Sequence, residues 1–138
     1  MKTVRVVMEC GQIAYISMKR YDSNHLDVCI ENSGHFGGNM INSAWIRLSM
    51  QNVEKLISDI DKFLTNAITS RKNIITNVSN DGNYYITTEA NHYTNNDLEI
   101  VVANTSRINS TITNEAFIRL NKSDATVLKN SILVALDE

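Results

Sequence analysis

Two short segments of the sequence place an arginine two positions after an aromatic residue, a combination that can bind nucleotides. Trp45 precedes Arg47, and Phe117 precedes Arg119. An aromatic ring can stack on a base, and a guanidinium can hold a phosphate through two parallel hydrogen bonds. The alternative is that each ring packs inside the protein or at a subunit interface. Because the pair occurs twice, the structural interpretation carries slightly more weight than the binding one.

A second group of candidates lies in polar segments near the predicted strand ends, where binding residues concentrate. Arg107 is our first choice as a ligand-binding residue, because the matching segment of the first half, Gly34-His35, has no arginine. Asparagines could read a base edge or a ribose, although they more often form turns by bonding to their own backbone. Solvated loop residues are an equally open interpretation of the arginines and tyrosines. The group consists of Arg20, Tyr21, His92, Tyr93, Asn95, Asn96, Asn104 and Arg107.

No catalytic or metal-binding pattern is evident in the sequence. The three histidines lack metal-ligand spacing. Cys10 and Cys29 lie in predicted strands without a CxxC motif, which indicates reduced thiols in a cytoplasmic protein. The glycine-rich segment at 36–39 lacks the lysine and the following helix of a phosphate loop, and no nucleophile elbow occurs. We therefore expect a binding protein without catalytic activity, metal or cofactor.

Composition limits the possible partners. The chain has 138 residues, a net charge of −2 and a pI of about 5.9. That charge is not typical of a protein whose affinity comes from neutralising many phosphates. No apolar run reaches membrane-spanning length, and Arg5 and Glu9 interrupt the start, which therefore does not look like a signal peptide. The prediction is a cytoplasmic protein that does not associate with membranes.

The elements that would position these residues occur twice along the chain. Leu26 to Leu64 aligns with Leu98 to Leu136 at a constant offset of 72, and Val4 aligns with Ile75 at an offset of 71. Such a regular match indicates an internal repeat, with residues 1–68 as the first copy and 72–138 as the second. Each copy, at about 70 residues, would bury only a marginal core alone. We expect the two copies to form one domain.

Each copy reads as four strands followed by a helix. Alternating apolar residues predict strands at 3–10, 13–19, 26–31 and 44–48, and again at 84–89, 98–103 and 116–120. A period of 3.6 predicts helices from about Met50 to Ala67 and from Lys122 or Ser123 to near the end. The predicted fold class is α+β, with tandem duplicated β-β-β-β-α modules, two antiparallel sheets and two helices. Alternation places Leu26, Val28 and Ile30 toward the helix, and the Trp45/Arg47 and Phe117/Arg119 pairs on the outer faces.

The strand-to-helix segment resembles that of a known fold. Both copies share one pattern of apolar residues, namely Ile46, Leu48, Val53, Leu56 and Ile60, then Ile118, Leu120, Ala125, Leu128 and Ile132. The pattern resembles the transcription coactivator positive cofactor four, a four-stranded sheet followed by a helix. Two such modules in one chain are similar to the Whirly family of plant single-strand DNA binders, although their Lys-Gly-Lys-Ala segment has no counterpart here. This resemblance implies single-stranded nucleic-acid binding.

The duplicated architecture and charge balance are also similar to those of phage anti-defence proteins of the Thoeris type. That resemblance implies a sponge that holds a cyclic ADP-ribose or cyclic nucleotide immune signal without cleaving it, in the cytoplasm of the host cell. We favour this function over a single-stranded DNA or RNA binder, because Asp27, Glu31 and Glu99 would repel a phosphate track. We favour it over a protein-interaction module because of the fold resemblance. We also expect a homo-oligomer, with Trp45 and Phe117 as exposed contact residues.

Overall fold

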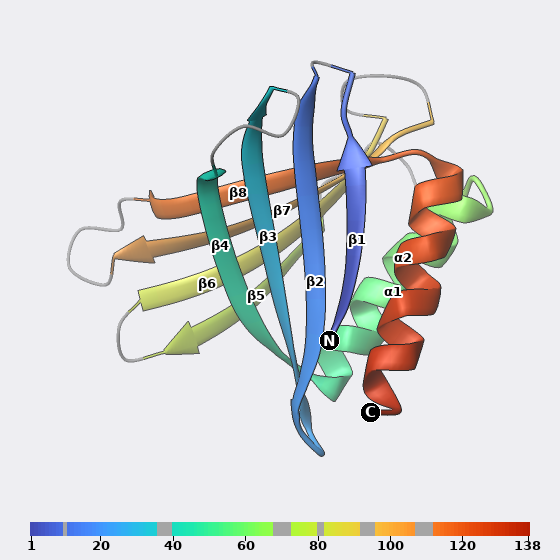
Figure 1. Cartoon of the computed structure of the whole chain (residues 1–138). Coiled ribbons are helices and arrows are strands. Elements are labelled where there is room, and N and C mark those ends of the chain that lie inside the picture. The colour runs from blue at the N-terminus through green and yellow to red at the C-terminus, as the bar shows by residue number, and fades with distance from the viewer. Residues whose placement is uncertain (10, 36–39, 68–72, 80–81, 92–95, 107–111) are drawn as a thin grey trace.

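The protein is described by a computed structural model that covers residues 1–9, 11–35, 40–67, 73–79, 82–91, 96–106 and 112–138. These residues form two antiparallel sheets and two helices (Figure 1). Sheet A contains, in spatial order, β1 (Lys2–Val7), β2 (Gln12–Asp22), β3 (His25–His35) and β4 (Met40–Ser49). Sheet B contains β5 (Asn73–Ser79), β6 (Gly82–Ala90), β7 (Leu98–Ser106) and β8 (Ile112–Leu120). The helices are α1 (Met50–Leu64) and α2 (Lys122–Leu136), and the α+β class with two antiparallel sheets and two helices is confirmed.

The predicted inner faces of the strands are confirmed. Leu26, Val28 and Ile30 of β3 are fully buried, whereas the alternating Asp27, Cys29 and Glu31 are only partly buried. One hydrophobic cluster joins buried residues from both sheets and both helices. Removing such apolar surface from water is the main favourable term in folding, at roughly 25 cal/mol per Å². The outer faces are therefore the part of each sheet that remains available for other contacts.

The pairing of the last two strands is the same in both sheets. Leu26 pairs with Leu48 and Asp27 with Arg47 in sheet A, while Leu98 pairs with Leu120 and Glu99 with Arg119 in sheet B. Each pair of strands also has a register shift at the matching position, after Asn32 and after Asn104. The two sheets thus present corresponding side chains at corresponding places, as far as the described residues show.

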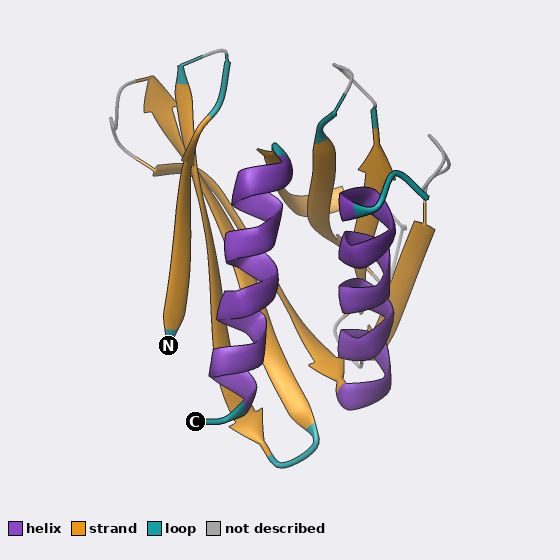
Figure 2. Ribbon diagram, turned by 90° about the vertical axis from the view of Figure 1, so that its right-hand side faces the viewer, coloured by secondary structure: helices purple, strands orange, loops and turns teal. Residues whose placement is uncertain are grey.

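The helices do not simply cover the sheets that precede them in sequence. α2 packs mainly on β1 and β2 of sheet A, although it follows sheet B in the chain (Figures 1 and 2). α1 contacts β3 and β4 but also reaches sheet B, where the Thr88 hydroxyl donates to Asp59 at 3.0 Å. Lys129 of α2 pairs with Asp61 of α1 at 2.6 Å, so the two helices lie side by side. Each sheet is therefore covered partly by elements from the other half of the chain.

Asn32 links the two sheets directly. Its side chain is fully buried, its amide nitrogen donates to the Phe117 carbonyl at 2.7 Å, and its oxygen accepts from the Phe117 N–H at 3.0 Å. Phe117 belongs to β8, which is the last strand of sheet B. A single side chain therefore satisfies both backbone groups of that residue, which would otherwise be costly to bury.

We expect Asn32→Ala to lower the free energy of unfolding by about 1–3 kcal/mol, because it leaves a buried donor and a buried acceptor without partners. Urea denaturation of the purified protein measures this. The matched control is Asn42→Ala, since Asn42 is the cross-strand neighbour of Asn32 but is exposed. Its change should stay within about 0.5 kcal/mol. Equal losses in the two variants would show that the Asn32 bridge does not stabilise the contact between the sheets.

Several predicted boundaries are wrong. β1 ends earlier than predicted, at Val7, and β3, β4, β7 and β8 are all longer than predicted. Two further differences have local reasons. The first helix ends at Leu64 rather than near Ala67, because Asn66 adopts a positive φ of 58°. The Ala67 N–H then bonds back to the Lys62 carbonyl at 2.7 Å, which closes the helix. The segment 21–25 is not a loop either. Tyr21 and Asp22 continue β2, and His25 already begins β3, so only a tight two-residue turn separates the strands.

The predicted helix starts are confirmed. The Ser49 hydroxyl accepts a hydrogen bond from the Asn52 N–H at 3.2 Å, and the Asn121 side chain accepts from the Asp124 N–H at 2.7 Å. Both are N-caps, which satisfy backbone donors that the first helical turn leaves unpaired. Neither described helix has the length and apolar character needed to cross a bilayer.

Candidate functional site

The outer face of sheet A brings together aromatic and charged side chains from three strands. Lys19 of β2 pairs with Asp27 of β3, which in turn pairs with Arg47 of β4. In the next row, Trp45 lies on the same face two residues before Arg47. The sheet therefore positions Trp45 and Arg47 as neighbours, as the alternation pattern predicts. This face of sheet A is the candidate site.

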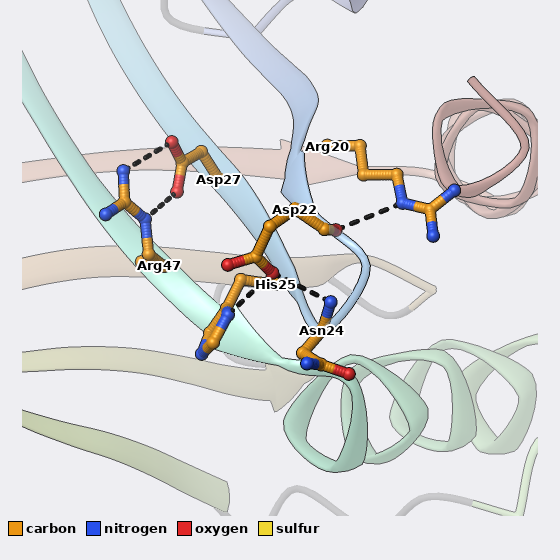
Figure 3. Close-up of polar contacts among 6 residues, drawn as sticks. All are labelled: Arg20, Asp22, Asn24, His25, Asp27 and Arg47. Atoms are coloured by element: carbon orange, nitrogen blue, oxygen red, sulfur yellow. Dashed lines mark hydrogen bonds and ion pairs between the residues drawn. The ribbon is translucent and has the colours of Figure 1, made fainter.

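Arg47 is held by two partners at once. Its Nε and Nη2 atoms donate to the two carboxylate oxygens of Asp27 at 2.7 and 3.0 Å (Figure 3). Its guanidinium carbon lies 3.3 Å from the centroid of the Tyr21 ring and 5.6 Å from that of Trp45. The hydrogen bonds to Asp27 are the main reason why the pKa of Arg47 is raised above its usual value. The guanidinium is thus a fixed, charge-compensated plane between two aromatic rings.

Trp45 is one of two exposed aromatic residues of this site, the other being Tyr21, which is 57% exposed. The Trp45 side chain remains 44% exposed. Its ring also packs against the ring of Tyr84 from sheet B, with the two ring centroids 5.5 Å apart. Tyr84 is nearly buried and therefore supports Trp45 from the core. Tyr21, Arg47, Trp45 and Tyr84 form a continuous series of planar groups, which we call the aromatic stack. Its exposed surface can accept another flat ring.

The hairpin that carries Tyr21 is braced by its own polar contacts. Asp22 accepts hydrogen bonds from the Asn24 N–H at 2.7 Å and from the His25 ring at 2.8 Å (Figure 3). The Asn24 N–H is the main reason why the pKa of Asp22 is lowered, and His25 adds to it. The His25 ring also meets Tyr21 edge to face, with centroids 6.5 Å apart. These contacts fix the strand ends that present the Tyr21 ring.

The corresponding pair on sheet B is arranged differently. Arg119 donates to Glu99 at 3.0 Å and lies 4.7 Å from the Phe117 ring centroid, but Phe117 is half-buried and packs against the hydrophobic core. The expectation that Phe117 is as exposed as Trp45 is therefore wrong. The physical reason is that Phe117 lies where β8 meets sheet A through Asn32. Sheet B offers no comparable exposed aromatic among its described side chains.

The two outer faces also differ in charge. Among the described side chains, the outer face of sheet A has three cations and three carboxylates, whereas that of sheet B has one cation and three carboxylates. The residues are Arg5, Lys19, Arg47, Asp22, Asp27 and Glu31 on sheet A, and Arg119, Glu89, Glu99 and Glu115 on sheet B. The outer face of sheet A is therefore balanced in charge, whereas that of sheet B is acidic and disfavours an anionic ligand.

Arg20 has a structural partner instead of facing the aromatic stack. Its Nη1 atom donates to the Leu136 carbonyl at 3.0 Å and to the Glu138 carbonyl at 3.4 Å. Figure 3 shows this side chain pointing toward the helix, away from Arg47. A cation at the C-terminal end of a helix satisfies carbonyls that have no partner within the helix. Arg20 and Tyr21, which are adjacent in the sequence, thus belong to different sites, although both also line a shallow cavity of about 380 Å³ with Lys19.

A separate cavity of about 310 Å³ lies between the end of β1 and the start of α2. Its lining includes Arg119 and Asn96, both predicted candidates, but also the acidic residues Glu9, Asp97 and Asp124. Asp97 is only 8% exposed, and its Oδ1 has no hydrogen-bond partner among the described residues. Because an uncompensated carboxylate repels phosphate, this cavity does not suit a nucleotide diphosphate.

Several predicted site residues cannot be placed. Arg107, His92, Tyr93 and Asn95 lie outside the described residues, and so does Cys10. Asn104 lies within β7, opposite Asn114 of β8, rather than in a loop. The structure therefore brings Trp45, Arg47 and Tyr21 together, keeps Phe117 and Arg119 at a second position, and assigns Arg20 to the end of α2.

Cys29 of β3 lies opposite Trp45 on the outer face of sheet A. Burial is the main reason why the pKa of the Cys29 thiol is raised, so the thiol stays protonated and weakly nucleophilic. Its nearest polar contacts are Ser43 at 3.7 Å and Glu31 at 3.9 Å. In the part of the chain that the structure describes, no three acidic, histidine or cysteine side chains cluster closely enough to hold a metal ion.

Sequence reasoning missed two members of this site. Asp27 was expected to repel phosphate, whereas its two carboxylate oxygens both bond to Arg47. The sequence offered one signal for this ion pair, because alternation puts Asp27 and Arg47 on the same outer face. Tyr84 gave no signal at all, because its contact with Trp45 joins different sheets. No protein-family model matches the chain, and neither does any curated protein.

Proposed function

We propose that this protein binds a small nucleotide on the outer face of sheet A and holds it without chemical conversion. The observation that carries the proposal is the position of Trp45, which is 44% exposed and is held by contacts with Arg47 and Tyr84. A ring that is fixed before binding loses little conformational entropy when a base stacks on it. The aromatic stack is therefore suited to be the base-binding platform.

The charges around the stack suit the phosphates of such a ligand. Lys19 lies in the same row as Arg47, about two strand spacings or roughly 10 Å away. Lys19 and Arg5 are both exposed, so their side chains can turn toward a bound phosphate. Arg47 stays with Asp27 in this proposal, and its role is to hold the rings of Tyr21 and Trp45 in place.

A more specific form of the proposal is a sponge for a cyclic nucleotide or a cyclic ADP-ribose-type immune signal. It builds on a tandem β-β-β-β-α, Whirly-like architecture. The pairing of β3 with β4, which recurs in β7 and β8 at an offset of 72 residues, supports this architecture. It also builds on the resemblance to phage anti-defence proteins, which implies a location in the host cytoplasm. Arg107, Tyr93 and Asn95 are proposed as further ligand contacts. A protonated Cys29 and a paired Arg47 favour retention of the ligand over turnover.

Denaturing the purified protein and analysing the released small molecules by mass spectrometry tests this proposal. The expected result is one intact nucleotide, recovered in a constant ratio to protein. Incubating the native protein with cyclic ADP-ribose before the same extraction covers the case in which purification removes the ligand. Failure to retain any nucleotide in both experiments would reject the proposal, and recovery of a cleaved product would replace a binding protein with an enzyme.

Single-stranded nucleic acid is the second candidate ligand, and the exposed Trp45 ring with exposed Lys19 on the same face favours it. Against it stand Asp27 and Glu31 on the same face and the net charge of −2 of the whole chain. A long strand would have to pass these carboxylates, whereas a small nucleotide can avoid them. The small ligand is therefore the better match.

We expect an oligothymidine of about 15 nucleotides to bind weakly at about 150 mM salt, with a shallow dependence on salt. The reason is that few phosphates are neutralised, so few counterions are released. Fluorescence anisotropy of a labelled oligonucleotide at several salt concentrations measures both quantities. Nanomolar binding with a steep salt dependence would instead establish a nucleic-acid-binding protein.

A further inference from the structure

A buried carboxylate lies in the wall of the cavity of about 310 Å³ between the end of β1 and the start of α2, which we call the acidic cavity (Figure 1). Asp97 is only 8% exposed, and its buried Oδ1 atom has no hydrogen-bond partner among the described residues. A charged oxygen that is removed from water without a partner costs free energy, so most buried carboxylates are paired. Asp97 is therefore a negative charge that a ligand in the cavity can compensate.

The turn before β7 holds Asp97 in this position. The Asn91 side-chain oxygen accepts a hydrogen bond from the Asn96 N–H at 2.8 Å, and the Asn91 N–H donates to the Asp97 carbonyl at 2.8 Å. The next residue, Leu98, pairs with Leu120 of β8, which places Asp97 beside the N-cap of α2. The backbone thus fixes Asp97 in the cavity wall before any ligand binds.

The other charged residues of the wall add to the negative charge. Glu9 and Asp124 are carboxylates, and Arg119 is the one cation among the lining residues that the structure describes. Arg119 already donates to Glu99, which does not line the cavity, at 3.0 Å. The partial positive charge at the N-terminal end of α2 offsets Asp124 in part. Three carboxylates against one guanidinium leave an excess of two negative charges, so the acidic cavity attracts a cation.

The first half of the chain provides an internal control. At the offset of 72, Asp97 corresponds to His25, and Asp124 corresponds to Asn52. His25 is only half-buried and bonds to Asp22 at 2.8 Å. A residue that served only the shared scaffold would recur in both halves, whereas the two acids do not. Asp97 and Asp124 are therefore specific to the acidic cavity.

We propose that the acidic cavity binds a short aliphatic diamine, whose two ammonium groups compensate the carboxylates and whose methylene chain packs on the apolar part of the wall. That part consists of Val6, Val7, Met8 and Leu120. The cavity volume of about 310 Å³ lies at the lower end of the range for small-molecule sites. Two positive charges match the excess of two negative charges, which a single ammonium group does not.

A bare metal ion is a poorer match for this cavity. No three acidic, histidine or cysteine side chains among the described residues cluster closely enough to coordinate one. An ammonium group needs no such shell, because it acts on a carboxylate as a charge at short range, where little water screens it. Trp45, Arg47 and Tyr21 do not line the acidic cavity, so diamine binding is independent of the proposed nucleotide site.

Isothermal titration calorimetry at about 20 mM salt, where charges are weakly screened, tests the proposal with diaminobutane as the probe. We expect saturable binding with a dissociation constant below about 1 mM, weaker binding of butylamine and no binding of butanediol. Asp97→Asn should weaken binding of diaminobutane by about tenfold or more, as expected for the loss of a contact between charged groups. The matched control Asp137→Asn removes the same charge from the exposed far end of α2, and should bind like the wild type.

Three results of this titration would overturn the proposal. The first is no binding of diaminobutane up to about 10 mM. The second is equal weakening in the two variants, which would indicate only the overall charge of the protein. The third is equally tight binding of butanediol, which would indicate a purely apolar pocket. Tighter binding of N-acetyl-lysine amide than of diaminobutane would reassign the cavity to a lysine side chain of a partner protein.

Thermal unfolding gives a readout that a purely structural role of Asp97 would not share. Without ligand, Asp97→Asn should unfold at the same temperature as the wild type or at a higher one, because the amide removes an unpaired buried charge. Diaminobutane should raise the Tm of the wild type but not that of the variant, since a ligand stabilises only a protein that binds it. A lower Tm of the ligand-free variant would mean that the carboxylate has a structural partner, and the proposal would fail.

Discussion

Leu128→Ala should lower the free energy of unfolding by about 2–5 kcal/mol, the usual range for truncating a fully buried leucine. Leu128 has no exposed surface, and α2 places it between the helix and strands β1 and β2. The variant should therefore leave a cavity between elements from the two halves of the chain. Leu56→Ala, at the corresponding position of α1, should cost a similar amount, since Leu56 is also fully buried. Urea denaturation followed by circular dichroism measures both losses.

Ser58→Ala is the control for this pair of variants. Ser58 is exposed on the same helix as Leu56, and its replacement should change stability by no more than about 0.5 kcal/mol. Losses near that value for both leucine variants would mean that neither helix contributes to a close-packed core. The assignment of the buried stripe would then be wrong.

Trp45→Ala should weaken nucleotide binding by about 1–3 kcal/mol, which corresponds to roughly 5-fold to 150-fold in the dissociation constant, the range for loss of one stacked base. The exposed ring is the surface on which we propose that the base stacks, whereas Arg47 is already held by Asp27. Isothermal titration calorimetry with cyclic ADP-ribose measures the change. Thermal unfolding of the variant without ligand shows separately how much the contact with Tyr84 contributes to folding.

Tyr85→Ala is the matched control on the other sheet. Tyr85 is a half-buried aromatic residue on the outer face of sheet B, opposite Ala103. Its replacement should leave the affinity for cyclic ADP-ribose within about threefold, because that face is acidic and Tyr85 points to the opposite side of sheet B from Tyr84. Similar weakening by both substitutions would indicate a general loss of structure, and the site on sheet A would lose its support.

Local patterns in the sequence predicted the local structure well. The alternation of Leu26, Val28 and Ile30 predicted the buried face of β3, and the 3.6-residue period of apolar residues predicted where both helices start. These features depend on residues within a few positions of each other, which a pattern can capture. The sequence did not locate the end of α1, because that end depends on the left-handed backbone conformation of Asn66. Other sequences can form the same turn, so the residues themselves do not identify it.

Contacts between distant segments account for what the sequence did not reveal. Nothing local indicates that α2 covers β1 and β2, that Arg20 meets the end of α2, or that Asn32 bonds to Phe117. The same limit applies to the site. Trp45 and Arg47 could be placed on one face, but their exposure depends on how the sheets meet, which buries Phe117 and leaves Trp45 accessible.

Fluorescence of Trp45 is the measurement that tests the central proposal most directly, because Trp45 is the only tryptophan in the chain. A base that stacks on its ring should quench or shift its emission in a saturable way. We predict this response when cyclic ADP-ribose or a cyclic dinucleotide is added, with saturation well below about 1 mM, and no response to ribose 5-phosphate, which lacks a base. Unchanged emission with every base-containing ligand up to about 1 mM would contradict nucleotide binding on the outer face of sheet A.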